Sequence, residues 1–186
     1  MTTSTNAAAV FVAEPRQRRP VHPLVVVATL PAAAVALLDF GFTPRGSVAA
    51  FFLATLAVLS VVDIRERRLP NAIVVPSAAF VLVAQMALFP DRAIEWVLAS
   101  GGTFLALLLL ALLYPAGMGM GDVKLGLLLG AGLGSAVPSA LLVAFLAGGV
   151  AGVALIAKRG AAARKSTIPF GPFLAFGAAV VLLLAE

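Results

Sequence analysis

Two aspartates stand out among the eight acidic residues of this 186-residue chain, because each lies at the edge of a long apolar run. Asp63 closes the run Ala-Val-Leu-Ser-Val-Val-Asp, and Asp122 opens another in Gly-Met-Gly-Met-Gly-Asp-Val-Lys. Carboxylates that meet in a low-dielectric site cannot both ionise easily, so one keeps its proton while the other is charged. Such a pair can activate water and polarise a peptide carbonyl. The two residues therefore predict an aspartic endopeptidase centre.

The glycines before the second aspartate suit this chemistry. Gly119 and Gly121 carry no side chain, so an extended substrate backbone could pass close to the carboxylate of Asp122. Loop flexibility or tight helix packing would explain the same glycines. Lys124 is interpreted either as local charge balance for the site or as one more cation at a membrane boundary.

Two proline-containing segments accompany the aspartates. Leu69, Pro70 and Asn71 follow Asp63 after five intervening residues. A second segment, Ile168-Pro169-Phe170-Gly171-Pro172, precedes the last apolar run. Both segments have the form of a helix start, with proline in the first turn.

The composition places these residues in a membrane protein. Hydrophobic residues make up 62% of the chain, the mean hydropathy is +1.10, and only 11% of residues are charged. Soluble domains have roughly a quarter of their residues charged. Open sheets cannot satisfy their backbone groups in lipid, and the strands of a barrel would alternate apolar and polar residues. The predicted fold is therefore an all-α, polytopic transmembrane helix bundle.

The apolar runs predict about seven spans, or six if the short fifth run does not cross. A spanning helix needs about 20 residues. The runs cover residues 24–38, 47–62, 72–89, 94–114, 119–134, 139–157 and 168–185. Glycines recur at four-residue spacing in the later runs, and such stripes let helix backbones approach closely. The glycines are Gly126, Gly130, Gly134, Gly148 and Gly152.

The distribution of basic residues tests this topology. With the N-terminus inside, the outer segments contain only Arg45 and Arg92, and the inner segments contain the other positive residues, as the positive-inside rule predicts. If the fifth run did not cross, Lys158 would lie outside. Seven spans are therefore favoured, with Asp63 and Asp122 both at the inner boundary. The inner residues are Arg16, Arg18, Arg19, Arg65, Arg67, Arg68, Lys124, Lys158, Arg159, Arg164 and Lys165.

The domain organisation is simple. Residues 1–21 are polar and end in the basic run Arg16-Gln17-Arg18-Arg19, which indicates a flexible cytoplasmic tail rather than a signal peptide. Residues 22–186 are predicted to form a single transmembrane domain. The chain has no cysteine and one histidine, His22, so no metal site and no cofactor are expected. The net charge of +5 is attributed to the inner membrane face and not to nucleic-acid binding.

Together, the three motifs resemble those of the prepilin leader peptidase family. That family has a first aspartate followed at fixed spacing by Ile/Leu-Pro-Asn/Asp, as here from Asp63 to Asn71. Its Gly-x-Gly-Asp-x-Lys-Leu segment is matched at residues 119–125, and its late Ile-Pro-Phe-Gly-Pro segment at residues 168–172. The resemblance covers about residues 45–186. Presenilin-like proteases share only the second aspartate motif, because Val62 stands where they have a tyrosine and Pro-Ala-Leu is absent.

The resemblance implies a membrane peptidase of the bacterial inner membrane, with its active site and N-terminus on the cytoplasmic side. Asp63 and Asp122 would be the catalytic pair. The substrates would be prepilins, type II secretion pseudopilins or Flp-type pilins, which lose a short basic leader. The lipid bilayer and the assembly proteins of a pilus or secretion complex would be further partners.

The sequence departs from larger family members, which have paired Cys-x-x-Cys motifs in a cytoplasmic domain and also N-methylate the new terminus. The chain resembles the short, core-only form, and N-methylation is not expected. Two alternatives stay open: a proton-translocating subunit in which the carboxylates carry protons, and a non-catalytic subunit of a pilus or secretion complex.

Overall fold

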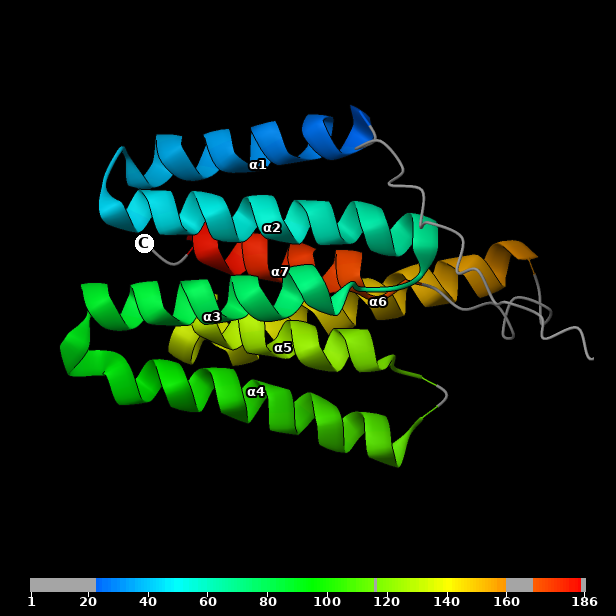
Figure 1. The fold of residues 1–186 in the computed structure, drawn as a ribbon. Coiled ribbons are helices and arrows are strands. Elements are labelled where there is room, and N and C mark those ends of the chain that lie inside the picture. Colours follow the sequence, from blue (N-terminus) through cyan, green and yellow to red (C-terminus); the bar gives the residue numbers. More distant parts are fainter. Residues whose placement is uncertain (1–22, 116, 160–168, 185–186) are drawn as a thin grey trace, which may run out of the picture.

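The computed structural model describes residues 23–115, 117–159 and 169–184, and in these ranges every regular element is helical (Figure 1). Each predicted span corresponds to one helix. The helices are α1 (Pro23–Phe40), α2 (Pro44–Glu66), α3 (Asn71–Leu88), α4 (Ala93–Leu113), α5 (Met120–Leu133), α6 (Val137–Arg159) and α7 (Gly171–Leu184). Short 3-10 turns, η1 (Pro90–Arg92) and η2 (Gly134–Ala136), join α3 to α4 and α5 to α6. The predicted tail, residues 1–21, lies outside the described residues.

Most of the helices lie in stretches that have the length and composition of membrane spans. Within the described residues, four stretches are long and apolar enough to cross a bilayer, and α7 is a shorter apolar helix. The last of the four covers α5, η2 and α6 in 39 residues, about twice what one crossing needs. The stretches are Pro44–Glu66, Asn71–Leu88, Pro90–Leu113 and Met120–Lys158. The prediction of an all-α, polytopic bundle is confirmed.

The connections alternate between the two ends of the bundle (Figure 1). One end, called here the aspartate end, holds the end of α2, the start of α5 and the start of α7. The opposite end, called here the far end, holds the α1–α2 turn, η1, η2 and the end of α7. Arg45 and Arg92 lie at the far end, whereas Lys124 and Lys158 lie at the aspartate end, as the charge pattern predicted.

Local sequence explains how α2 begins and ends. Thr43 is the N-cap, and its Oγ1 accepts a hydrogen bond of 3.0 Å from the backbone N–H of Gly46. Pro44 occupies the first turn, where its missing N–H costs nothing. Arg67 ends the helix in the left-handed conformation, with φ 50°, and its N–H donates to the carbonyl oxygen of Asp63 over 2.8 Å. This turn places the Asp63 side chain at the last residues of α2.

The helix at the centre of the bundle is α5, which with α7 is one of the two shortest α-helices described. It contacts α2, α3, α4, α6 and α7. At 1.5 Å per residue its 14 residues extend about 21 Å, less than the ~30 Å hydrocarbon thickness. Because neighbouring helices cover most of α5, it does not need to match the bilayer by itself. The largest fully buried side chains of the core are Phe52, Leu56, Leu59, Leu107, Leu125, Leu128, Leu129, Leu174, Val74, Val81 and Val123.

Glycines bring α5 close to α4. A Cβ on Gly130 would overlap the backbone of Ala99 and Ser100, and one on Gly126 would come within 3.0 Å of the Leu107 side chain. The hydroxyl of Ser100 also donates to the carbonyl oxygen of Leu127 over 2.9 Å. The predicted packing role is confirmed for these two glycines. It is also confirmed for Gly148 and Gly134, where such a Cβ would come within 3.0 Å of Phe170 and 2.7 Å of Trp96, and Gly134 in addition ends α5 with a positive φ of 56°. It is wrong for Gly152, where no described residue lies within 4 Å of such a Cβ.

We expect Gly130→Ala to lower the free energy of unfolding by about 1–3 kcal/mol, because the added methyl group must push two helix backbones apart. Chemical or thermal unfolding of the purified protein in detergent measures this. Gly101→Ala is the matched control on α4, since a Cβ there meets nothing within 4 Å. Equal stability of the two variants would contradict close α4–α5 packing.

Candidate active site

The first aspartate is held from two sides of the bundle. Asp63, in the last turn of α2, is only 6% exposed. Its Oδ2 accepts a hydrogen bond of 3.0 Å from the backbone N–H of Gly171, the first residue of α7. This bond links residues that are 108 positions apart in the sequence. The bond fixes the orientation of the carboxylate through a neutral backbone donor, and no charged side chain is needed.

The second aspartate opens α5. Asp122 is 9% exposed, and its backbone N–H donates to the carbonyl oxygen of Gly119, the N-cap residue, over 3.1 Å. A carboxylate in the first turn of a helix faces the positive end of the helix dipole, which favours negative charge. The helix start therefore supports Asp122 electrostatically, as the hydrogen bond to Gly171 supports Asp63.

Both aspartates line one cavity of about 370 Å³ at the aspartate end of the bundle. The cavity also contains most of the predicted Leu-Pro-Asn and Gly-x-Gly-Asp residues. Its lining residues are Asp63, Arg67, Arg68, Leu69, Asn71, Gly119, Met120, Gly121, Asp122 and Lys124. Paired carboxylates in a cavity that admits water and a segment of substrate have the arrangement that general acid–base hydrolysis needs.

The two glycines before Asp122 have different surroundings. A Cβ on Gly119 would meet the Oδ2 of Asp122 at 3.7 Å, so this position leaves the carboxylate accessible. A Cβ on Gly121 would come within 3.0 Å of the Cβ of Leu69. Gly121 therefore lets the start of α5 pack against the α2–α3 connection. This favours tight helix packing, and not the approach of a substrate backbone, as the reason for a glycine at this position.

Lys124 joins two of the predicted motifs. Its Nζ donates a hydrogen bond of 3.0 Å to Oδ1 of Asn71, the first residue of α3. In the described part of the chain Lys124 forms no ion pair with either aspartate. Pro70, at the N-cap of α3, contributes its carbonyl oxygen, which accepts from the N–H groups of Ile73 and Val74 over 3.0 and 3.1 Å. These contacts hold the Leu-Pro-Asn segment beside the start of α5.

The late proline segment contributes one residue to the site. Gly171 contacts Asp63, whereas Pro169, Phe170 and Pro172 are not among the described residues that line the cavity, so their place in the site stays a prediction. The ring of Phe170 instead packs against Phe145 of α6, with ring centroids 5.2 Å apart. An aromatic side chain is buried more favourably against another helix than in a polar cavity. Ile168 lies outside the described residues.

Sequence reasoning missed three lining residues. The sequence pattern indicated only inner-face cations for Arg67 and Arg68 and no role for Met120. Their position directly before Leu69, or between Gly119 and Gly121, was the available signal. In the described ranges no three histidine, cysteine or acidic residues gather into a metal-binding group.

Comparisons with known proteins identify relatives of this chain. The Type IV leader peptidase family matches residues 50–153, which include both aspartates and both motifs that line the cavity. A "Prepilin leader peptidase/N-methyltransferase" of Burkholderia pseudomallei (strain 1026b) is 38% identical over 170 residues, covering 87% of this chain and 54% of the relative. Proteins with the same description from Bacillus subtilis (strain 168) and Pseudomonas aeruginosa are 27% and 30% identical over 166 and 171 residues.

The alignments cover most of this chain but a smaller share of each relative. The Bacillus and Pseudomonas matches each include 89% of this chain, but 66% and 59% of the relatives. The chain therefore spans between half and two thirds of the length of these curated relatives. No solved structure shows a significant match.

Proposed function

This chain belongs to the Type IV leader peptidase family, and we propose that it is a membrane aspartic endopeptidase that removes the short basic leader from type IV pilin-like precursors. The observation that carries the proposal is the shared cavity of Asp63 and Asp122, which come from helices distant in the sequence. The names of the relatives support a prepilin substrate.

The reaction needs one ionised and one protonated carboxyl group. The ionised group removes a proton from a water molecule, whose oxygen attacks the scissile carbonyl carbon while the protonated group hydrogen-bonds the carbonyl oxygen. The tetrahedral intermediate then collapses, the C–N bond breaks, and the leaving nitrogen takes a proton from the pair. The two aspartates titrate as a unit, so base and acid are assigned to the pair and not to either residue.

The surroundings assist this chemistry in stated ways. Gly171 orients Asp63, the start of α5 favours charge at Asp122, and Gly119 leaves an open approach to that carboxylate. Burial of both side chains limits competing solvent. Each effect orients or stabilises the carboxyl groups before the substrate binds. The site therefore needs little reorganisation during the reaction.

The proposed location is the inner membrane of a bacterium, with the aspartate end in the cytoplasm. The cations at that end support this orientation through the positive-inside rule. The aspartates lie at helix ends rather than near the middle of α2 and α5. That position does not favour the proton-translocating alternative, in which acids are expected near the midplane.

Co-expression of this chain with a pilin-like precursor tests the proposal. We expect the precursor in membranes to lose its leader, seen as a shift in size, and mass spectrometry of the product to give one new N-terminus directly before the hydrophobic helix. The precursor expressed without this chain is the control. A panel of pilin, pseudopilin and Flp-type precursors that all stay full length beside well-expressed, membrane-inserted protein would overturn the proposed activity.

A further inference from the structure

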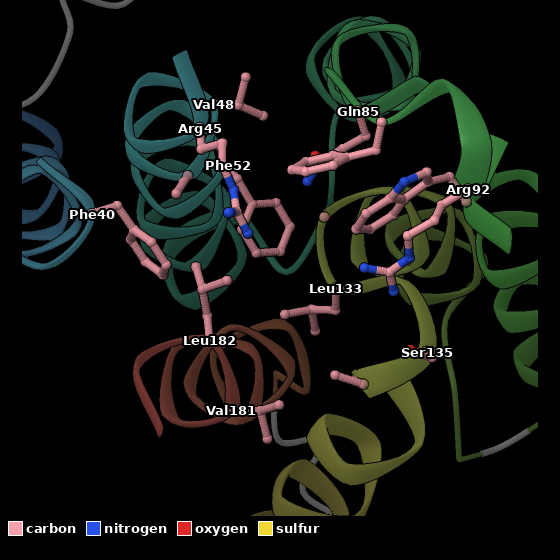
Figure 2. A pocket seen from close by; sticks show the side chains of 15 residues that line it. Phe40, Arg45, Val48, Phe52, Gln85, Arg92, Leu133, Ser135, Val181 and Leu182 are labelled. Atoms are coloured by element: carbon pink, nitrogen blue, oxygen red, sulfur yellow. The ribbon is translucent and has the colours of Figure 1, made fainter. Parts of the chain in front are cut away.

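A second cavity, of about 280 Å³, lies at the far end of the bundle, away from the aspartates (Figure 2). It forms where α1 ends, α2 begins, α3 ends and α5 turns through η2 into α6. One part of its wall is apolar and includes Val48, Leu133, Val181 and Leu182. This far-end pocket contains no residue of the candidate active site, so peptide hydrolysis does not account for it.

Two arginines reach the far-end pocket from different helices. Figure 2 shows Arg45, from the start of α2, and Arg92, from η1, on opposite sides of it. The Arg45 guanidinium lies 4.8 Å from the ring centre of Phe89, and that of Arg92 lies 5.5 Å from the ring of Trp96. Stacking on an aromatic face holds a guanidinium in place and leaves its in-plane N–H groups free to donate.

The two arginines of the pocket keep hydrogen-bond donors without a protein partner. Arg92 uses its Nε and Nη2 on Glu95, over 2.8 and 2.7 Å, which leaves Nη1. Among the described residues, Arg45 forms no hydrogen bond or ion pair. Trp96 is 7% exposed and contributes its ring to the wall rather than an accessible donor. The donors that a ligand with acceptor oxygens would meet are therefore the guanidinium N–H groups of Arg45 and the Nη1 of Arg92.

We propose that the far-end pocket binds a phosphate group, and that its natural source is the headgroup of an anionic phospholipid. Guanidinium groups match phosphate oxygens in charge and in planar donor geometry. The pocket lies at the ends of membrane-spanning helices, where lipid phosphates lie, and the apolar wall suits the glycerol and upper acyl region. Inorganic phosphate has the same acceptor oxygens as the lipid headgroup but has no glycerol or acyl region to contact the apolar wall.

Lipid retention by the purified full-length protein tests this proposal. The protein is exchanged into nanodiscs or detergent with phosphatidylglycerol, with phosphatidylcholine, or with inorganic phosphate and no added lipid. Native mass spectrometry measures bound lipid, and thermal unfolding measures stabilisation by each addition. We expect phosphatidylglycerol to bind and raise the unfolding temperature, and phosphatidylcholine not to do so. In Arg45→Gln the affinity for phosphatidylglycerol should fall about tenfold or more.

Lys158→Gln is the matched control, because it removes one exposed cation at the aspartate end of the bundle. It should bind phosphatidylglycerol as the unchanged protein does. If Arg45→Gln does not fold, Arg92→Gln, which removes the other guanidinium group of the same pocket, replaces it. Stabilisation by inorganic phosphate that is lost in Arg45→Gln would assign the pocket to free phosphate. Equal lipid binding by the pocket variants and Lys158→Gln, or stabilisation by neither probe, overturns the proposal.

Discussion

Replacing either Asp63 or Asp122 by asparagine is expected to lower precursor cleavage by about 10³-fold or more. Asparagine keeps the shape of the side chain but neither takes up nor releases a proton at neutral pH. Because the pair works as one acid–base unit, each single variant should lose as much activity as the double variant. The measurement is the rate of leader removal in membranes that contain equal amounts of each variant.

Glu66→Gln is the matched control for these changes. Glu66 ends the same helix as Asp63 and is exposed, and it does not line the cavity. It should cleave at the rate of the unchanged protein. Cleavage by Asp63→Asn or Asp122→Asn at a rate near that of Glu66→Gln would show that the two carboxyl groups are not the catalytic pair.

Gly171→Ala should reduce the cleavage rate by about 10²-fold, while the protein stays folded in the membrane. A Cβ at this position would lie 2.8 Å from Oδ2 and 3.3 Å from Cγ of Asp63. The methyl group must therefore displace the carboxylate that the Gly171 N–H holds. The loss should appear in kcat rather than in KM, because the change affects the orientation of a catalytic group and leaves most of the substrate contacts intact.

Gly149→Ala provides the comparison for Gly171→Ala. Gly149 lies in α6, and an added Cβ there meets nothing within 4 Å. Alanine is also the better helix former, so this variant should keep full activity and equal or slightly higher stability. Full activity of Gly171→Ala beside a normal unfolding temperature would mean that the contact with Asp63 does not position the catalytic group.

The helices were predictable because the signal for a membrane span is strong. All seven apolar runs became helices whose ends differ from the predicted ends by only a few residues. The fifth run was the weakest prediction as a span, since it is short. The structure shows why it is nevertheless a helix: other helices surround α5, so packing and not lipid contact determines its stability.

The site was predictable only in part. Asp63, Asp122 and the two motifs beside them come together as expected, because both aspartates were placed at the same membrane boundary. The contacts of residues 169–172 could not be predicted from the sequence. Which of its residues would contact an aspartate depends on the rotation of α7, and that is set by the packing of Gly177 against Ala140 and Ala144 of α6. The left-handed conformation of Arg67 also lacked a signal, because no glycine marks it.

The hydrogen bond between Gly171 and Asp63 determines when during synthesis of the chain the site becomes complete. A chain leaves the ribosome from its N-terminus, so α2 and α5 carry both aspartates into the membrane before α7 has been made. Until α7 arrives, the Asp63 carboxylate has no backbone donor from residue 171. The proposed peptidase therefore completes its catalytic geometry only after α7 has been translated. Incomplete chains, although they contain both aspartates, would not process precursors that are inserting into the same membrane.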